Sequence, residues 1–234
     1  MGEAVPVQEA ALNNAEWCHA FCRSHGITGR FDAVAWSSAE RTPPLYPDAV
    51  TLVSGCSPES VVSRVDASPG CSIKDSFADV DLRPSGFEVL FAAEWLRRDQ
   101  PRGSDPSKGW SAIADVDELE RWQAAWGESP VEEPFFRREL LGDPRIKILA
   151  RADGIGLRAG AIATRSRRVI GLTNVFDLEG DLESAWSDGA SAARAVWGWM
   201  PVVGYEAGES LDAAHRAGFE TIGSLAVWVN QSHS

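Results

Sequence analysis

The feature that most constrains the fold is a regular alternation of short apolar stretches with amphipathic stretches between residues 110 and 229. The apolar stretches have the length of strands, and the amphipathic ones repeat their apolar residues with a helical period. This alternation is typical of an α/β or α+β domain in which helices flank a mixed, twisted sheet. The expected strands are 110–114, 146–152, 157–164, 169–176, 201–206 and 219–229, and the expected helices are 116–126, 134–141, 182–197 and 210–217.

Residues 1–109 are less regular, but they contain one clear helix signal. Apolar side chains repeat with a helical period over residues 9–25, and Gly26 follows as a stop signal. Weaker signals predict a short strand at 49–53 and one or two helical turns at 58–65. The chain is therefore expected to open with a helix.

Two further features of this first part are a proline-rich strap and a hairpin. The segment Arg41–Asp48 contains three prolines, which exclude a helix and favour a stiff extended path. Apolar and acidic residues alternate over Phe77–Leu82, a Pro-Ser-Gly turn follows, and Phe87–Leu96 is a long apolar run. This order predicts two strands joined as a β-hairpin.

The most loop-like segment, residues 99–109, is rich in Pro, Gly and Ser. It is the best candidate boundary between two parts, although a surface loop inside one domain fits equally well. Residues 1–109 would form an N-terminal extension of helix, strap and hairpin, packed on the sheet or continuing it. Residues 110–234 would form the main domain.

Composition excludes several classes of protein. The chain has 234 residues, of which 44% are hydrophobic, and this is typical of a folded domain. No apolar run approaches the roughly 18 residues of a membrane span, and the N-terminus lacks the pattern of a signal peptide. The net charge of −12 opposes binding to nucleic acid backbones. We therefore expect a cytoplasmic protein with no membrane or nucleic-acid partner.

Four cysteines raise the question of a metal site. Cys18, Cys22 and His25 would share one face of the first helix, an arrangement that can coordinate zinc. The same face continues through alanines, however, and free cysteine is among the residues most often buried as a small hydrophobe. The expectation is that the cysteines are reduced and structural and that no metal is bound.

The last third of the chain resembles the GNAT acyltransferase superfamily. The segments that carry the resemblance are Val202–Glu206, the Ala-rich stretch from Leu211, and the Gly218-Phe219 pair that follows it. They are similar to that family's fifth strand, fourth helix and entry into the sixth strand. The order of elements from Trp110 to Val229 agrees with the same family, so the resemblance covers about the second half of the chain.

The resemblance implies a thioester donor. In that family the fourth and fifth strands separate, and the pantetheine arm of acetyl-CoA binds to the strand backbone between them. Here it implies that Leu172, Thr173, Asn174 and Val175 bind acetyl-CoA or another acyl-CoA or pantetheine thioester.

Two parts of the family pattern are altered in this sequence. Where the family has a glycine-rich turn for the CoA diphosphate, residues 176–183 contain one glycine and four acidic residues. Glycines in such a turn let backbone N–H groups approach the phosphates, whereas carboxylates repel them. Ala214 stands at the position of the usual general-acid tyrosine, and Ala207 lies near that of an asparagine. The diphosphate motif is therefore degenerate.

Three residues are candidates for catalysis. Glu206 and Tyr205 end the expected strand 201–206, and strand alternation sends them to opposite faces. A half-buried glutamate suits a general base, although Glu206 could instead cap the next helix and Tyr205 could simply pack. Asn174 interrupts an apolar strand, and its amide would either orient a ligand or bond to a neighbouring strand.

Arg41 and Tyr46 of the strap, together with Glu94, are the candidate substrate-binding residues. The sequence thus predicts an acyltransferase that moves an acyl group from CoA or a pantetheine carrier to a small-molecule amine. The alternative is a GNAT-like protein without acetyl transfer, either a small-ligand-binding module or a lyase or isomerase that uses the same cleft. The oligomeric state is left open.

Overall fold

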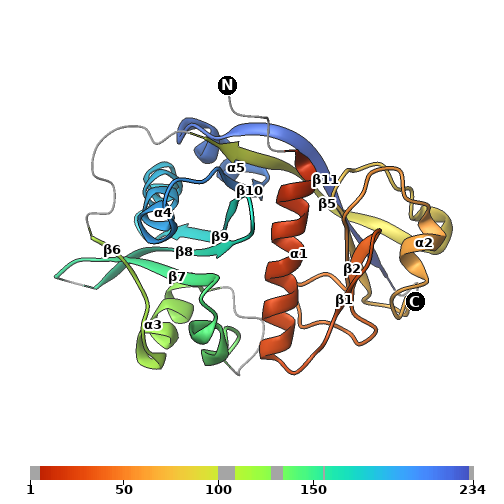
Figure 1. Cartoon of the computed structure of the whole chain (residues 1–234), viewed down its shortest axis with the longest axis horizontal. Coiled ribbons are helices and arrows are strands. Elements are labelled where there is room, and N and C mark those ends of the chain that lie inside the picture. Colours follow the sequence, from red (N-terminus) through yellow and green to blue (C-terminus); the bar gives the residue numbers. More distant parts are fainter. Residues whose placement is uncertain (1–5, 100–108, 128–133, 155, 232–234) are drawn as a thin grey trace. The chain divides into compact units, whose positions relative to one another are not determined.

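The computed structural model describes residues 6–99, 109–127, 134–154 and 156–231 (Figure 1). These residues form an α+β structure with five α-helices, two short 3-10 helices and 11 strands that hydrogen-bond as a mixed sheet. The chain divides into two compact units. Unit 1 comprises residues 1–95 and 222–234, and unit 2 comprises residues 96–221.

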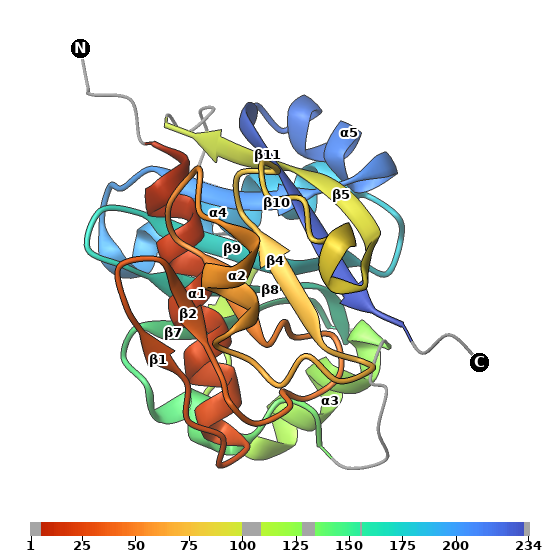
Figure 2. The ribbon, with the colours of Figure 1, turned by 90° about the vertical axis from the view of Figure 1, so that its right-hand side faces the viewer.

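Unit 1 contains most of the N-terminal elements and the end of the chain. Its strands β1, β2 and β3 pair antiparallel in sequence order, β3 pairs parallel with β4, and β4 pairs antiparallel with β11 (Figure 2). Its elements are α1 (Val7–Ser24), β1 (Arg30–Phe31), β2 (Ala35–Ser37), β3 (Ala49–Thr51), α2 (Pro58–Val62), β4 (Ser72–Asp75), the 3-10 helix η1 (Arg83–Ser85), and most of β5 (Phe87–Arg98) and β11 (Glu220–Asn230).

Local sequence explains the helices of unit 1. The first helix lies where its periodicity predicts, and Trp17 and Phe21 on its apolar side are buried. In α2, the Ser57 side chain accepts a hydrogen bond from the Ser60 N–H, which is the expected N-cap, and Pro58 occupies the first helical position. These two predictions are confirmed.

The predicted hairpin is wrong in its first strand. Residues 77–82 form a turn and an irregular segment, and the strand that precedes β5 in sequence is β4, which pairs with β3 and β11. The cause is the buried carboxylate of Asp75, which accepts hydrogen bonds from the backbone N–H groups of Phe77 and Val80. Ala78 has a positive φ of 52° in this turn, so an acidic side chain bends the backbone where alternation predicted a strand.

Unit 2 contains the regular second half of the chain. Strands β6 to β9 are antiparallel neighbours in sequence order, and β10 pairs parallel with β9. Its elements are β6 (Trp110–Ala112), α3 (Val116–Trp126), the 3-10 helix η2 (Arg138–Gly142), β7 (Ile146–Ala152), β8 (Leu157–Arg165), β9 (Ile170–Asp177), α4 (Leu182–Trp197), β10 (Val202–Glu206) and α5 (Gly208–Arg216).

The core of unit 2 fixes how α4 and α5 pack. Trp186 of α4 is fully buried and contacts the Phe219 ring edge-on at 5.0 Å between centroids. Gly218 has a φ of +88° after α5, which reverses the chain, and the Phe219 N–H donates to the Ala214 carbonyl. The Gly-Phe pair therefore ends the helix and seals the core, as the sequence predicted.

One predicted helix of unit 2 is largely absent. The expected helix at 134–141 is only the 3-10 helix η2 (Arg138–Gly142), and residues before it are irregular. Phe135 and Phe136 are both almost fully buried, and the Phe136 N–H donates to the Gln123 side chain of α3. Burying two adjacent rings removes the one-sided pattern of a surface helix, so tertiary packing overrides local propensity here.

Candidate functional site

The parallel pair β9 and β10 is joined only at its beginning. The register pairs Val202 with Ile170 and Val203 with Gly171, and no further pair follows among the described residues of these strands. The side chains are buried up to Leu172 in β9 and up to Gly204 in β10, and they are partly exposed beyond these points. Backbone groups that leave a ladder need other partners, so this is a place where an extended ligand can hydrogen-bond.

A bulge at Asn174 lies at the same place. On the β8 side, Gly160 pairs with Phe176 and Ile162 pairs with Thr173, so β9 carries one extra residue opposite Ala161. Asn174 has a φ of 52°, which is the left-handed region. The extra residue reverses the alternation of side chains, because Leu172 and Val175 both pack toward the α4 core. The sequence flagged Asn174 as unusual, and the backbone explains why asparagine stands there.

Substitution of Asn174 tests this backbone conformation. We expect Asn174→Gly to keep the free energy of unfolding within about 0.5 kcal/mol of wild type, and Asn174→Val to lower it by about 1–2 kcal/mol, because a β-branched residue is strained at positive φ. Denaturant unfolding measures both variants. Thr173→Val is the control at the neighbouring position, and equal stability of Asn174→Val and Thr173→Val would contradict the strained bulge.

Alternation along β10 predicts that Tyr205 and Glu206 lie on opposite faces of the strand. A Cβ built on Gly204 would point at the Trp186 ring of α4, which assigns Gly204 and Glu206 to the α4 face. Tyr205 is therefore on the face of α3. On that face the Phe176 ring of β9 contacts Trp122 of α3 edge-on, with 5.1 Å between centroids. Both Tyr205 and Glu206 are partly exposed, and the N-cap of α5 is Ala207, which makes no side-chain bond.

The loop from β9 to α4 is closed on the carboxylate of Asp177. Its Oδ1 accepts hydrogen bonds from the backbone N–H groups of Glu179 (2.8 Å) and Asp181 (3.1 Å), and the side chain is 0% exposed. Further along the loop, Asp181 is the N-cap of α4, and its carboxylate accepts a hydrogen bond from the Ser184 N–H. Hydrogen bonds from Ser184 lower the pKa of Asp181. Two carboxylates therefore occupy the positive end of α4.

The arginines around this loop are paired with acidic residues of the chain. Arg151 donates to Asp177 Oδ2 at 2.6 Å. Arg158 lies 3.5 Å from the Glu179 carboxylate, and Arg216 of α5 lies 3.2 Å from Glu183. The three pairs bring β7, β8 and α5 together around the start of α4.

These residues do not fit a diphosphate at the start of α4. The N–H groups of Glu179 and Asp181 already donate to a buried carboxylate, and Arg151 already neutralises it. A phosphate group would have to displace that carboxylate or lie beside it, and both are electrostatically unfavourable. The loop that the sequence aligned with the family's diphosphate turn is thus closed on a carboxylate of the chain itself.

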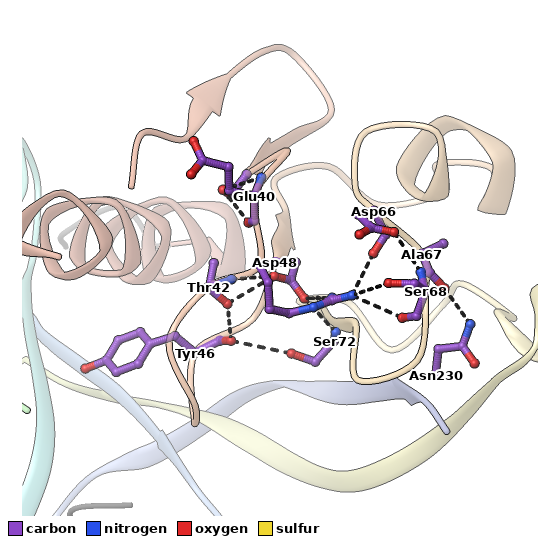
Figure 3. A network of polar contacts seen from close by, with 11 residues as sticks. Glu40, Thr42, Tyr46, Asp48, Asp66, Ala67, Ser68, Ser72 and Asn230 are labelled. Atoms are coloured by element: carbon purple, nitrogen blue, oxygen red, sulfur yellow. Dashed lines mark hydrogen bonds and ion pairs between the residues drawn. The ribbon is translucent and has the colours of Figure 1, made fainter. Parts of the chain in front are cut away.

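In unit 1, Arg41 and Tyr46 are both engaged in packing and hydrogen bonds. Arg41 donates to Asp48 Oδ2 at 2.6 Å, to the carbonyl oxygens of Asp66 and Ser68, and to the Ser68 hydroxyl. Figure 3 shows the surrounding network, in which Tyr46 accepts from Thr42 through its carbonyl. The Tyr46 ring stacks on Phe21 of α1 with 3.6 Å between centroids. The strap is therefore tied to its own unit.

The candidate residues thus divide between the units. Leu172, Thr173, Asn174 and Val175 of β9 and the pair Tyr205 and Glu206 of β10 all belong to unit 2, at the place where the two strands stop pairing. Arg41, Tyr46 and the half-buried Glu94 of β5 belong to unit 1, and their role in substrate binding stays a prediction. Sequence reasoning missed Arg151 and the role of Asp177, because only the acidic run was visible and its partners lie on other elements.

The described residues contain no cluster of three or more His, Cys, Asp or Glu side chains placed to hold a metal ion. In the same residues, no helix has the length and apolarity needed to cross a membrane. Burial raises the pKa of the Cys18 thiol to about 11 and that of Cys71 to about 12. These two thiols are therefore protonated at neutral pH and are poor nucleophiles.

Comparison with known proteins gives matches among solved structures only. No family model matches the chain, and no curated protein matches it. A GCN5-related N-acetyltransferase from Kribbella flavida is 14% identical, with a TM-score of 0.66 over 98% of this chain and 97% of that chain. A protein assigned to the GNAT family from Novosphingobium aromaticivorans DSM 12444 is 11% identical, with a TM-score of 0.61 over 95% of this chain and 99% of that one.

At these identities the likeness concerns the fold, which is GNAT-like. It extends over nearly the whole chain, whereas the sequence resemblance reached only its second half. A functionally unknown conserved protein from Staphylococcus epidermidis ATCC 12228 also matches, at 11% identity and a TM-score of 0.52 over 70% of this chain and 74% of that one. The structural neighbours thus include both N-acetyltransferases and a protein of unknown function.

Proposed function

We propose that the protein is an acyltransferase that moves an acyl group from a pantetheine thioester, such as an acyl-CoA, to a small-molecule amine. The observation that carries this proposal is the end of pairing between β9 and β10 after Gly171 and Val203, with a bulge at Asn174. The GNAT-like fold supports it, because structural neighbours with that fold are named N-acetyltransferases.

In this proposal the donor arm binds along Leu172–Val175. A pantetheine arm carries two amide groups in an extended chain, and strand backbone recognises such a chain by hydrogen bonding, as it does an added strand. The bulge turns Val175 toward the α4 core, so the backbone at Asn174 changes direction where the arm would lie. The thioester, when bound, supplies a carbonyl carbon with a good leaving group.

The transfer forms one C–N bond and breaks one C–S bond. The neutral amine attacks the thioester carbonyl, the thiolate leaves, and the products are an amide and a thiol. The ammonium form of the amine loses one proton before the attack, and the nitrogen loses a second proton after it. The thiolate takes up one proton, so the site needs a proton acceptor and a proton donor. Tyr205 is the better placed candidate, because the α4 face that Glu206 shares is filled by the apolar core around Trp186 and Leu172.

A ligand-dependent rise in melting temperature tests the proposal. We expect acetyl-pantetheine or acetyl-CoA at about ten times its Kd to stabilise the protein by about 1.4 kcal/mol, which corresponds to a rise in Tm of about 3–6 °C. Release of free thiol on addition of a panel of primary amines then identifies the acceptor. If neither thioester changes Tm and no amine releases thiol, the proposal is wrong.

Separate substitution of the two β10 residues tests proton transfer. We expect Tyr205→Phe to lower kcat by about 10²-fold or more and Glu206→Gln to have the smaller effect, because the two side chains lie on opposite faces. Steady-state kinetics with the identified amine measures both, and a kcat–pH profile separates loss of a proton-transfer group from loss of packing. If both variants keep kcat within about twofold of wild type, neither residue of β10 takes part in the chemical step.

One observation favours a second candidate function. The filled anion position at the start of α4 is what a GNAT-like module that binds a small ligand without acyl transfer would also have. Absence of a Tm shift with either thioester, combined with a shift from another small molecule, would favour this alternative.

A further inference from the structure

We infer that Asp177 is a built-in anion that takes the place of a donor diphosphate, so that the thioester donor is selected by its pantetheine arm and acyl group and not by its nucleotide. This inference rests on the proposed function for its donor, but the part that concerns Asp177 stands on geometry. It names the substrate class as pantetheine thioesters irrespective of what is attached to the far end of the arm.

The Asp177 carboxylate has three donors. One oxygen accepts from the loop N–H groups of Glu179 and Asp181, and the other accepts from Arg151 at 2.6 Å. The two N–H groups precede the first helical residue, Leu182, and together with a guanidinium they are donors that a phosphate could also use. Here a side chain from the preceding strand supplies the oxygens.

The pair of Asp177 and Arg151 is largely removed from water. The Asp177 side chain is fully buried, and Arg151 is itself mostly buried, at 23% exposed. A charge-assisted pair of this kind that is removed from water is costly to break, because each partner would be left as an unpaired buried charge. A phosphate therefore competes with an intramolecular ligand at very high effective concentration.

The segment that follows Asp177 is acidic. Glu179, Asp181 and Glu183 follow Asp177 within six residues, and the pairs with Arg158 and Arg216 use the nearby cations. A diphosphate bound here would lie beside these carboxylates, and the three arginines that could neutralise it are already paired with acidic side chains. The donor's recognition must then come from the part that reaches β9, which is the uncharged pantetheine arm.

The direct test measures pyrophosphate binding by wild type and Asp177→Ala. The substitution frees the two N–H groups and Arg151 together, so we expect the variant to bind inorganic pyrophosphate at least about tenfold more tightly than wild type. Isothermal titration and Tm shifts report binding without any need for activity. Circular dichroism and the Tm without ligand show that the variant is folded.

Asp153→Ala is the matched control. The Asp153 carboxylate also accepts one hydrogen bond from a loop N–H, that of Gly156, and one from an arginine, Arg158, at 2.8 Å. Asp153 lies in the same unit. Its removal makes the same change in net charge but does not open the start of α4. We expect no gain in pyrophosphate binding from this variant. An equal gain from both variants would assign the effect to charge alone and overturn the inference.

The wild-type protein supplies a test that does not depend on how the variants fold. We expect no saturable pyrophosphate binding by wild type, and we expect coenzyme A and pantetheine to bind it with Kd values within about threefold of each other. A wild type that binds pyrophosphate, or that binds coenzyme A more than about tenfold tighter than pantetheine, would overturn the inference. If neither thiol binds, the proposed function fails, while the pyrophosphate comparison still decides the role of Asp177.

Discussion

Asp48→Ala is expected to destabilise the protein by about 3 kcal/mol or more and to lower its Tm by about 6–12 °C. This is a large part of the roughly 5–15 kcal/mol that stabilises a folded domain. Thermal and denaturant unfolding measure the change. The effect is large because one buried carboxylate accepts hydrogen bonds from Arg41 and Thr42 of the strap and from Ser72, 24 positions further along the chain.

The contacts of Asp48 explain this expectation. Its side chain is 2% exposed and accepts from Arg41 Nη1 (2.6 Å), from the Thr42 N–H (2.8 Å) and from the Ser72 N–H (2.9 Å) (Figure 3). Alanine at this position would leave two backbone donors and a guanidinium without their acceptor, and buried donors without partners are costly. The strap would then lose the side-chain part of its attachment to β4 and keep the backbone bond from the residue 48 N–H to the Ser72 carbonyl.

Two further variants separate the charge from the hydrogen bonds. Asp48→Asn keeps an acceptor for Thr42 but loses the ion pair with Arg41, so its destabilisation should be smaller than that of Asp48→Ala. Asp81→Ala is the surface control, because the pair of Asp81 with Arg83 is exposed and should not change the measured stability. Equal stability of Asp48→Ala and Asp81→Ala would show that the strap is not held by this network.

Gly204→Ala is expected to lower stability by about 1–3 kcal/mol and to abolish the donor-induced rise in Tm. A Cβ on Gly204 would lie 2.8 Å from the Leu172 carbonyl oxygen and 2.9 Å from the Trp186 ring. Backbone on one side and a buried indole on the other leave little room to adjust, so β9 and β10 must shift at the residue just beyond their last pair. Denaturant unfolding and the thioester Tm assay measure the two effects.

Gly189→Ala is the matched control for this prediction. Gly189 lies in α4 in the same core, but a Cβ there would meet its nearest atoms at 3.6–3.7 Å, which is ordinary contact. Alanine in a helix interior is favoured over glycine by up to about 1 kcal/mol, so this variant should be neutral or stabilising. If Gly204→Ala has the same free energy of unfolding and the same thioester-induced Tm shift as Gly189→Ala, then the close approach of Gly204 to Leu172 limits neither stability nor donor binding.

The elements of unit 2 could be predicted from the sequence because their signals are local. Asp115 caps α3 by accepting from the Glu118 N–H, and Gly218 ends α5 with a positive φ, as these residue types predict. The predictions for 134–141 and 77–82 were wrong where a buried contact competed with local pattern. In the first case two phenylalanines pack inward, and in the second Asp75 bends the chain.

The candidate site was predicted unevenly for a similar reason. The sequence drew attention to Asn174, Tyr205, Glu206 and the acidic run after Phe176, because each departs from its apolar or glycine-rich surroundings. It indicated that carboxylates would repel a diphosphate. That Asp177 accepts hydrogen bonds from its own loop and pairs with Arg151 from β7 depends on residues 26 positions apart in the chain.

The sequence by itself therefore determined the first helix and most elements of unit 2 in their order, since periodicity, caps and turn residues act over a few neighbouring positions. Only the tertiary structure decided where β9 and β10 stop pairing, which face of β10 carries Tyr205, and what Asp177 binds. These depend on register and on contacts between distant residues, and neither is specified by any short segment.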